Sequence, residues 1–135
     1  MRQFWLGHRS QRLSLRRKRS LDRKALAGDA AVVSRESGLR TARRVSHCFI
    51  LDVPGHDNPL IITDAAINIA PTLADKVDIV QNAIDLAHAL GAQEVRVAIL
   101  SAVETVNPHI PSTIEAAALC KMADRGQITG ALIDG

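Results

Sequence analysis

The sequence is poor in aromatic residues, in cysteine and in long hydrophobic stretches. Of its 135 residues, two are Phe, one is Trp and none is Tyr, so a hydrophobic core has to be built from Ile, Leu, Val and Ala. No apolar run approaches the roughly 20 residues of a membrane-spanning helix. Cys48 and Cys120 stand alone without CxxC spacing, which favours reduced, buried thiols over a disulfide or a metal half-site. We therefore expect a cytoplasmic protein that does not associate with membranes.

Standard site motifs are missing as well. The sequence has neither GxGxxG nor GxxxxGK[ST], which would bind nucleotide phosphates, and no GxSxG, which would present a nucleophilic serine. His47, His56, His88 and His109 lie too far apart for metal-ligand spacing, so a zinc or iron site is not expected. We interpret His47 as a core histidine in a strand and His88 as a partner for the dipole at a helix C-terminus.

What the sequence does have is a sharp division of charge. Residues 1–44 contain 13 Lys and Arg against 3 acidic residues, whereas residues 45–135 contain 4 against 11. An arginine-rich segment of this kind is typical of a solvated arm. We interpret residues 1–30 as a basic arm that is disordered, or not native to the rest of the chain because of a truncation or an altered reading frame. Attraction to nucleic-acid phosphates is the less favoured alternative.

From residue 45 onward the hydrophobic pattern predicts an α/β fold, beginning with a hairpin. Residues 45–53 alternate in polarity, a stretch rich in turn-forming residues follows, and residues 60–63 form a second short apolar run. A helix is then expected from Thr72, which can cap it together with Asp75 in a variant of the capping box. Gly91 provides the left-handed residue that commonly ends a helix.

The alternation of strand and helix then repeats. Residues 95–100 are typical of a strand buried in a parallel sheet. Pro111 and an S-x-x-E capping box that begins at Ser112 predict a second helix, which ends at about Asp124. Residues 128–133 predict the last strand. These elements together predict a βαβαβ parallel-sheet core with a hairpin, covered by helices.

Two loops carry polar side chains where such sheets bind ligands, at the carboxyl ends of strands. Residues 63–71, which include Asp64 and Asn68, follow one predicted strand, and residues 101–108 follow the next. Their polar groups could line a ligand cleft. The alternative is structural, because Asp and Asn in loops commonly hydrogen-bond nearby backbone N–H groups.

Several long runs of residues carry a resemblance to a known family. With residues 45–47, 63–71, 80–91, 101–108 and 117–126, in this order, the chain resembles the phosphate acetyltransferase/phosphate butyryltransferase family. It most resembles the butyryltransferase-like branch, which in some bacteria is fused behind a MaoC-type hydratase. The resemblance covers about residues 31–135 and implies a partial acyltransferase domain, mostly the second domain, in a truncated chain.

The resemblance implies reversible acyl transfer: acyl-CoA and phosphate give acyl phosphate and CoA, with acetyl or butyryl as the acyl group. It also implies a homodimer whose two-domain fold is similar to that of isocitrate and isopropylmalate dehydrogenases. The active site would lie between the domains and need no metal or cofactor, with CoA as a substrate. The family's catalytic residues are expected in segments that this sequence lacks, so none is assigned and the isolated chain is expected not to turn over.

Five residues match family loops that face the cleft, and the resemblance implies that they bind substrate or shape the cleft: Thr63, Asp64, Asn68, Ser101 and Glu104. Arg40, Arg43 and Arg44 could attract the phosphates of CoA, although exposed arginines are more often simply solvated. Two other functions stay open. One is a non-catalytic dimerisation fragment of the enzyme, and the other is a nucleic-acid-associated protein that works through its basic arm.

Overall fold

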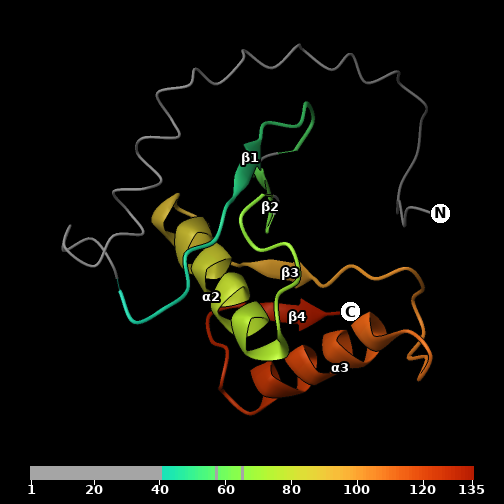
Figure 1. Ribbon diagram of the computed structural model, residues 1–135. Helices are drawn as coiled ribbons and strands as arrows, with labels where there is room; N and C mark the ends of the chain where they lie inside the picture. Colours follow the sequence, from blue (N-terminus) through green and yellow to red (C-terminus); the bar gives the residue numbers. More distant parts are fainter. Residues whose placement is uncertain (1–40, 57, 65) are drawn as a thin grey trace. The chain divides into compact units, whose positions relative to one another are not determined.

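The computed structural model describes residues 41–56, 58–64 and 66–135, so the basic arm predicted for residues 1–30 lies outside the described residues. The elements of the described part are, in chain order, β1 (Phe49–Leu51), β2 (Leu60–Ile62), α2 (Leu73–Ala89), β3 (Arg96–Ala98), α3 (Pro111–Asp124) and β4 (Leu132–Asp134) (Figure 1). This order of strands and helices confirms the prediction of an α/β fold.

β1 and β2 form the predicted hairpin, and they pair in antiparallel orientation. β1 is shorter than the strand predicted over 45–53, because carbonyl groups that precede it bind side chains instead of a neighbouring strand. The hydroxyl of Thr63 donates to the carbonyl oxygen of His47 at 3.0 Å. In the same way, Nδ2 of Asn68 donates to the carbonyl oxygen of Val45 at 3.1 Å.

α2 begins and ends where the sequence predicts. Thr72 is its N-cap: the N–H of Asp75 donates to Oγ1 of Thr72 at 3.3 Å, and the N–H of Thr72 donates to Oδ2 of Asp75 at 2.9 Å. These two bonds satisfy two of the N–H groups that a helix start leaves free. At the other end Gly91 adopts φ +98°, a left-handed conformation that glycine accepts without strain.

α3 does not begin with the predicted capping box. Ile110 occupies the N-cap position without a side-chain hydrogen bond, and Pro111 opens the helix, a place that suits a residue with no N–H. Ser112 therefore lies inside the first turn, where its hydroxyl is 2.6 Å from that of Ser101. The prediction that Ser112 caps this helix is wrong, because Pro111 starts the helix two positions before Thr113, where a Ser112 cap would start it.

Thr113 holds the loop before α3 in place of a cap. Its side chain is 4% exposed. Its Oγ1 accepts from the N–H of Asn107 at 2.9 Å and donates to the carbonyl oxygen of Ile110 at 2.8 Å. A buried hydroxyl with both its donor and its acceptor in use fixes the loop against the helix that follows.

β3 and β4 are parallel neighbours connected through α3, as expected of a strand–helix–strand unit. β4 begins only at Leu132, later than the predicted strand over 128–133. Gly130 turns the chain with φ +87°, and Ile128 packs into the core from the preceding loop with 2% exposure. The segment is thus apolar because it is buried, while only its last part is paired as a strand.

The strands do not form one parallel sheet. Within the described residues they make two separate pairs, β1 with β2 and β3 with β4, so the predicted βαβαβ sheet is wrong where it joins β2 to β3. A groove lies between these two strands and is lined by residues of both. The backbones therefore do not reach each other to form ladder hydrogen bonds.

The hydrophobic core lies between the two helices and the β3–β4 pair. Val80 and Ile84 of α2, Leu119 of α3 and Ile128 are each 6% exposed or less, and apolar residues of β3 and β4 pack against them. Val80 and Ile84 belong to an apolar stripe with helical spacing. In the described part of the chain, β1 and β2 contribute no residue to this core cluster.

Candidate functional site

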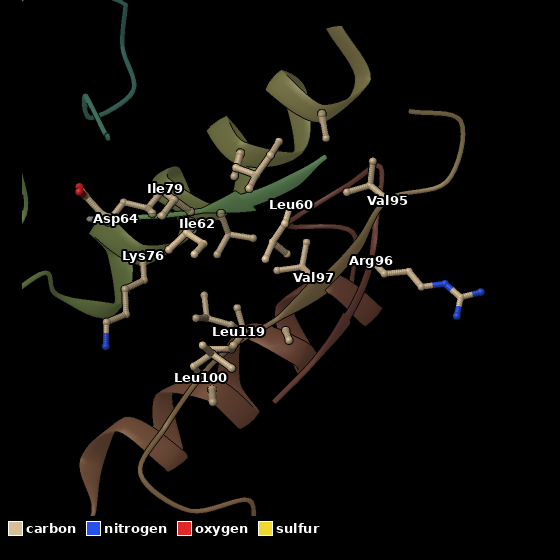
Figure 2. A pocket seen from close by; sticks show the side chains of 18 of the residues that line it. Leu60, Ile62, Asp64, Lys76, Ile79, Val95, Arg96, Val97, Leu100 and Leu119 are labelled. Atoms are coloured by element: carbon tan, nitrogen blue, oxygen red, sulfur yellow. The ribbon is translucent and has the colours of Figure 1, made fainter. Parts of the chain in front are cut away.

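An apolar groove of about 1030 Å³ lies between β2, β3 and the two helices (Figure 2). Residues 58–64 form one wall, residues 94–100 form another, and parts of α2 and α3 complete the lining. Figure 2 shows Leu60 and Ile62 close to Val97 in the interior, whereas the side chain of Arg96 points away from it. The interior of the groove is therefore apolar, and its polar groups lie toward its ends.

Three of the predicted site residues, Thr63, Asp64 and Asn68, line this groove, but the chain itself uses their polar atoms. The carboxylate of Asp64 accepts from the N–H groups of Ala66 at 3.0 Å and Ile67 at 3.1 Å, and from Nδ2 of Asn68. Burial acts to raise the pKa of Asp64, but these hydrogen bonds together outweigh it and lower the pKa below its usual value. A charged Asp64 thus organises the loop that borders the groove.

Arg44 connects this loop to the first half of α2. Its Nε donates to Oδ1 of Asn68 at 2.6 Å, and its guanidinium pairs with Asp75 at 3.1 Å. Its backbone N–H donates to Oδ2 of Asp78 at 2.9 Å. One residue therefore fixes the position of the Asn68 loop relative to the helix, at one end of the groove.

Arg43 is also paired, with Asp85 of α2. The hydrogen bond from Arg43 is the main reason why the pKa of Asp85 lies below its usual value. Arg43 and Arg44 are half-exposed, yet a CoA phosphate would have to compete with carboxylates for both. Arg40, the third arginine considered for this role, lies outside the described residues.

The structure does not bring the second polar loop into the groove. Ser101 contacts Ser112, which lines the groove, but Ser101 itself is not part of the lining. Glu104 is exposed and also lies outside the lining. Thr63, Asp64 and Asn68 therefore share one cavity, while Ser101 lies one contact away and Glu104 apart, and the substrate-binding role of all five stays a prediction.

Sequence reasoning missed an ion pair at the groove. Lys76 of α2 pairs with Glu115 of α3, both line the groove, and their side chains are 27% and 31% exposed. Glu115 drew attention only as part of the supposed capping box. No local pattern links two residues on separate helices, so the sequence contained no signal for this pair.

Cys120 and His47 are two other side chains that could take part in chemistry, and the surroundings of each favour a structural role. Burial, followed by the charges of Asp134 and Asp124, raises the pKa of Cys120, so its thiol is held protonated and is a poor nucleophile. The ring of His47 meets that of Phe49 edge-on, with centroids 4.6 Å apart. His47 Nδ1 is buried and, among the described residues, has no hydrogen-bond partner. His47 is only partly buried and lies outside both β1 and the core cluster, so the prediction of a satisfied core histidine in a strand is wrong.

In the part of the chain that the structure describes, neither helix combines the length and the apolar character that a bilayer crossing requires. In the same residues, His, Cys, Asp and Glu side chains do not gather in groups of three or more that could hold a metal ion.

A parallel strand–helix–strand unit beside a hairpin, with an apolar groove between them, defines an α/β protein whose described strands form two separate pairs. The family model for phosphate acetyl/butaryl transferase matches residues 26–135. The chain therefore belongs to the phosphate acetyl/butyryl transferase family.

Relatives with both acyl specificities are similar to this chain. The phosphate acetyltransferase of Rhizobium meliloti is 68% identical over 104 residues, which are 77% of this chain and 33% of the relative. That of Rickettsia felis is 64% identical over 107 residues, 78% of this chain and 31% of the relative. The phosphate butyryltransferase of Clostridium acetobutylicum is 46% identical over 105 residues, 78% of this chain and 35% of the relative.

A solved structure agrees with these relationships. A branched-chain phosphotransacylase from Enterococcus faecalis V583 superposes with a TM-score of 0.70 at 30% identity, covering 86% of this chain and 40% of that chain. The chain thus spans about a third of the length of the curated relatives that it matches.

Proposed function

We propose that this chain is part of a phosphate acyltransferase, which moves an acyl group reversibly between CoA and inorganic phosphate. The observation that carries the proposal is the family match over residues 26–135, together with 68% identity to the Rhizobium meliloti phosphate acetyltransferase. In the reaction a phosphate oxygen bonds to the thioester carbonyl carbon and the carbon–sulfur bond breaks. The CoA sulfur leaves as a thiolate and takes up a proton.

We further propose acetyl as the acyl group. The acetyltransferases of Rhizobium meliloti and Rickettsia felis are 68% and 64% identical to this chain, whereas the Clostridium acetobutylicum butyryltransferase is 46% identical. CoA enters as a substrate, and the proposal includes no metal or further cofactor.

In this proposal the catalytic groups lie in the two thirds of the family polypeptide that this chain does not match. The chain supplies an α/β unit whose loops face the substrate, with Asp64 and Asn68 organising one of them through the contacts described above. The complete enzyme would be a cytoplasmic homodimer with two domains arranged as in isocitrate and isopropylmalate dehydrogenases, and residues 31–135 would belong mostly to the second.

A chimera tests the proposal directly. The 104 residues of the Rhizobium meliloti enzyme that match this chain are replaced by those of this chain, and thiol release from acetyl-CoA and phosphate is followed. We expect turnover by the chimera, with acetyl-CoA preferred over butyryl-CoA, and none by the isolated chain. In the chimera Asp64→Ala should lower kcat/KM by about tenfold or more, because the loop loses the acceptor that orders it.

The matched control is Asp124→Ala, which removes an exposed carboxylate whose partner is Lys121 of the same helix, away from the groove. It should leave turnover unchanged. A folded chimera that releases no thiol would contradict the proposed activity. Turnover by the isolated chain would instead contradict the assignment of the catalytic groups to the unmatched two thirds.

A further inference from the structure

We propose that Arg44 is a positioning residue for acyl transfer, and that it acts through Asn68 on the loop of residues 63–71. The inference rests on the proposed function, because that function supplies the reaction and the place of the loop beside the substrate. It gives Arg44 a role in turnover instead of in the capture of CoA phosphates. It also makes Asn68 the connection between Arg44 and the loop.

The chain itself occupies both ends of the Asn68 amide. Oδ1 accepts from Nε of Arg44 at 2.6 Å, and Nδ2 donates to the carbonyl oxygen of Val45 at 3.1 Å and to the carboxylate of Asp64. Turning the amide over would set its N–H groups against the guanidinium and its oxygen against two other oxygens. The hydrogen bond from Arg44 therefore favours the one orientation in which Asn68 donates to Asp64.

Asp64 then orders the backbone of the loop. Its carboxylate accepts from the N–H groups of Ala66 at 3.0 Å, Ile67 at 3.1 Å and Asn68 at 3.2 Å. Because successive N–H groups converge on one side chain, the path of the loop follows the position of that carboxylate. A line of hydrogen bonds thus runs from Arg44 through Asn68 to Asp64 and ends in the backbone beside the substrate, where small displacements alter the geometry of the reacting atoms.

The backbone of Arg44 is held on α2 independently of its side chain. Its N–H donates to Oδ2 of Asp78 at 2.9 Å, and its carbonyl oxygen accepts from Nδ2 of Asn82 at 2.8 Å. The guanidinium also pairs with Asp75 at 3.1 Å, but a half-exposed pair contributes little to stability. Arg44→Ala therefore removes the contact with the loop while the backbone contacts that hold this segment on the helix remain.

Arg43 provides a matched control. The side chains of Arg43 and Arg44 are 46% and 50% exposed, and each pairs with a carboxylate of α2. The hydrogen bonds and the ion pair of Arg43 within the described residues go to Thr41 and Asp85, and none goes to the loop. Arg43→Ala thus removes an equally exposed charge from the same segment without changing a contact of the loop.

Hydrogen exchange in the complete 135-residue chain tests the effect on the loop. In Arg44→Ala the three amides that donate to Asp64 should exchange about fivefold faster, because a hydrogen bond that holds the loop is lost. Arg44→Lys should behave almost like Arg44→Ala, since one ammonium group does not reproduce the fork that contacts both Asn68 and Asp75. Arg43→Ala should leave the exchange of these amides unchanged.

Kinetics of the chimera described above test the effect on the reaction. Arg44→Ala should lower kcat by about tenfold and change the KM values for acetyl-CoA and phosphate by less than about twofold. Asn68→Ala should have a similar effect. The double variant should be no slower than Asn68→Ala alone, because residues that act in one line do not contribute independently.

Three results would overturn the inference: unchanged exchange of the loop amides in Arg44→Ala, kcat losses that multiply in the double variant, or a higher KM for acetyl-CoA with kcat intact. The last result would make Arg44 a binder of CoA phosphates. An unsubstituted chimera that releases no thiol contradicts the proposed activity instead, and the exchange data then decide whether Arg44 orders the loop. An active chimera that keeps its kcat in Arg44→Ala contradicts only the positioning role.

Discussion

At the scale of the single residue, His88 fastens the end of α2 to the turn that leads into β4. Its Nδ1 lies 2.9 Å from the carbonyl oxygen of Ala92, and its Nε2 lies 2.7 Å from that of Gly130. Carbonyl oxygens only accept, so both contacts are hydrogen bonds only when both ring nitrogens carry protons. The contact with Gly130, followed by that with Ala92, raises the pKa of His88 above its usual value.

This geometry makes stability depend on pH. A group whose pKa is higher in the folded state stabilises fully below its unfolded pKa and loses that contribution as the pH rises through the folded value. We therefore expect urea unfolding to show stability falling as the pH rises above the ordinary histidine pKa of about 6.5. His88→Gln keeps one donor without the titration, so it should flatten this part of the profile. An unchanged profile in the variant would contradict the role of His88.

The residue types predicted some of these roles and could not predict others. His88 lies in the last turn of α2, where its interpretation as a partner of the helix dipole places it, but Gly130, one of its two hydrogen-bond partners, is 42 residues further along the chain. The tendency of Asp to bind nearby backbone N–H groups correctly anticipated the contacts of Asp64. The pairing of Arg44 with α2 was not foreseen, since it depends on where the chain passes the helix.

At the scale of the element, two substitutions at the start of α3 test whether Thr113 or Ser112 stabilises the first turn of this helix. Thr113→Val removes the acceptor of a backbone N–H at a side chain that is 4% exposed, so unfolding free energy should fall by about 2 kcal/mol. Ser112→Ala loses one hydrogen bond to another hydroxyl and should cost only about 0.5 kcal/mol. Urea denaturation of both variants measures the difference. The opposite order would mean that Ser112 is the cap after all.

Local sequence patterns predicted the helices and strands well, and their first and last residues less well. The Thr72 and Asp75 capping box and the Gly91 stop are local features, and all are confirmed. The S-x-x-E match at Ser112 is wrong because the N-cap is Ile110, two positions earlier, and a proline opens the first turn. The strands are shorter than their apolar runs, since burial makes a segment apolar whether or not its backbone pairs.

At the scale of the whole molecule, a substitution of Ile84 tests how far the stability of the helices and of the β3–β4 pair depends on one core. It is 0% exposed and belongs to the cluster that joins α2, α3 and the β3–β4 pair. Ile84→Ala should lower the unfolding free energy by about 2–5 kcal/mol through lost burial and a cavity. The same change at Ile114, which is 45% exposed, should cost clearly less. Guanidinium denaturation compares the two variants. Equal losses of unfolding free energy would contradict a core centred on Ile84.

The sequence could not predict the arrangement of the sheet. Strand order along the chain favoured a continuous parallel sheet, and the family resemblance added no pairing between particular strands. Whether β2 meets β3 depends on what lies between them, and in this chain that place is an open groove. Pairing across a sheet is set by non-local packing, which hydrophobic periodicity does not encode.

The hairpin is attached differently from the rest of the molecule. It contributes nothing to the core cluster of the described residues, and the polypeptide leading into it is tied to α2 through the half-exposed pairs of Arg43 with Asp85 and Arg44 with Asp75. Dissolved ions screen such charges while leaving burial of Ile84 and Leu119 intact. A concentrated salt buffer would therefore loosen one wall of the groove before the helices separate. Measurements of binding to the groove consequently need a constant ionic strength.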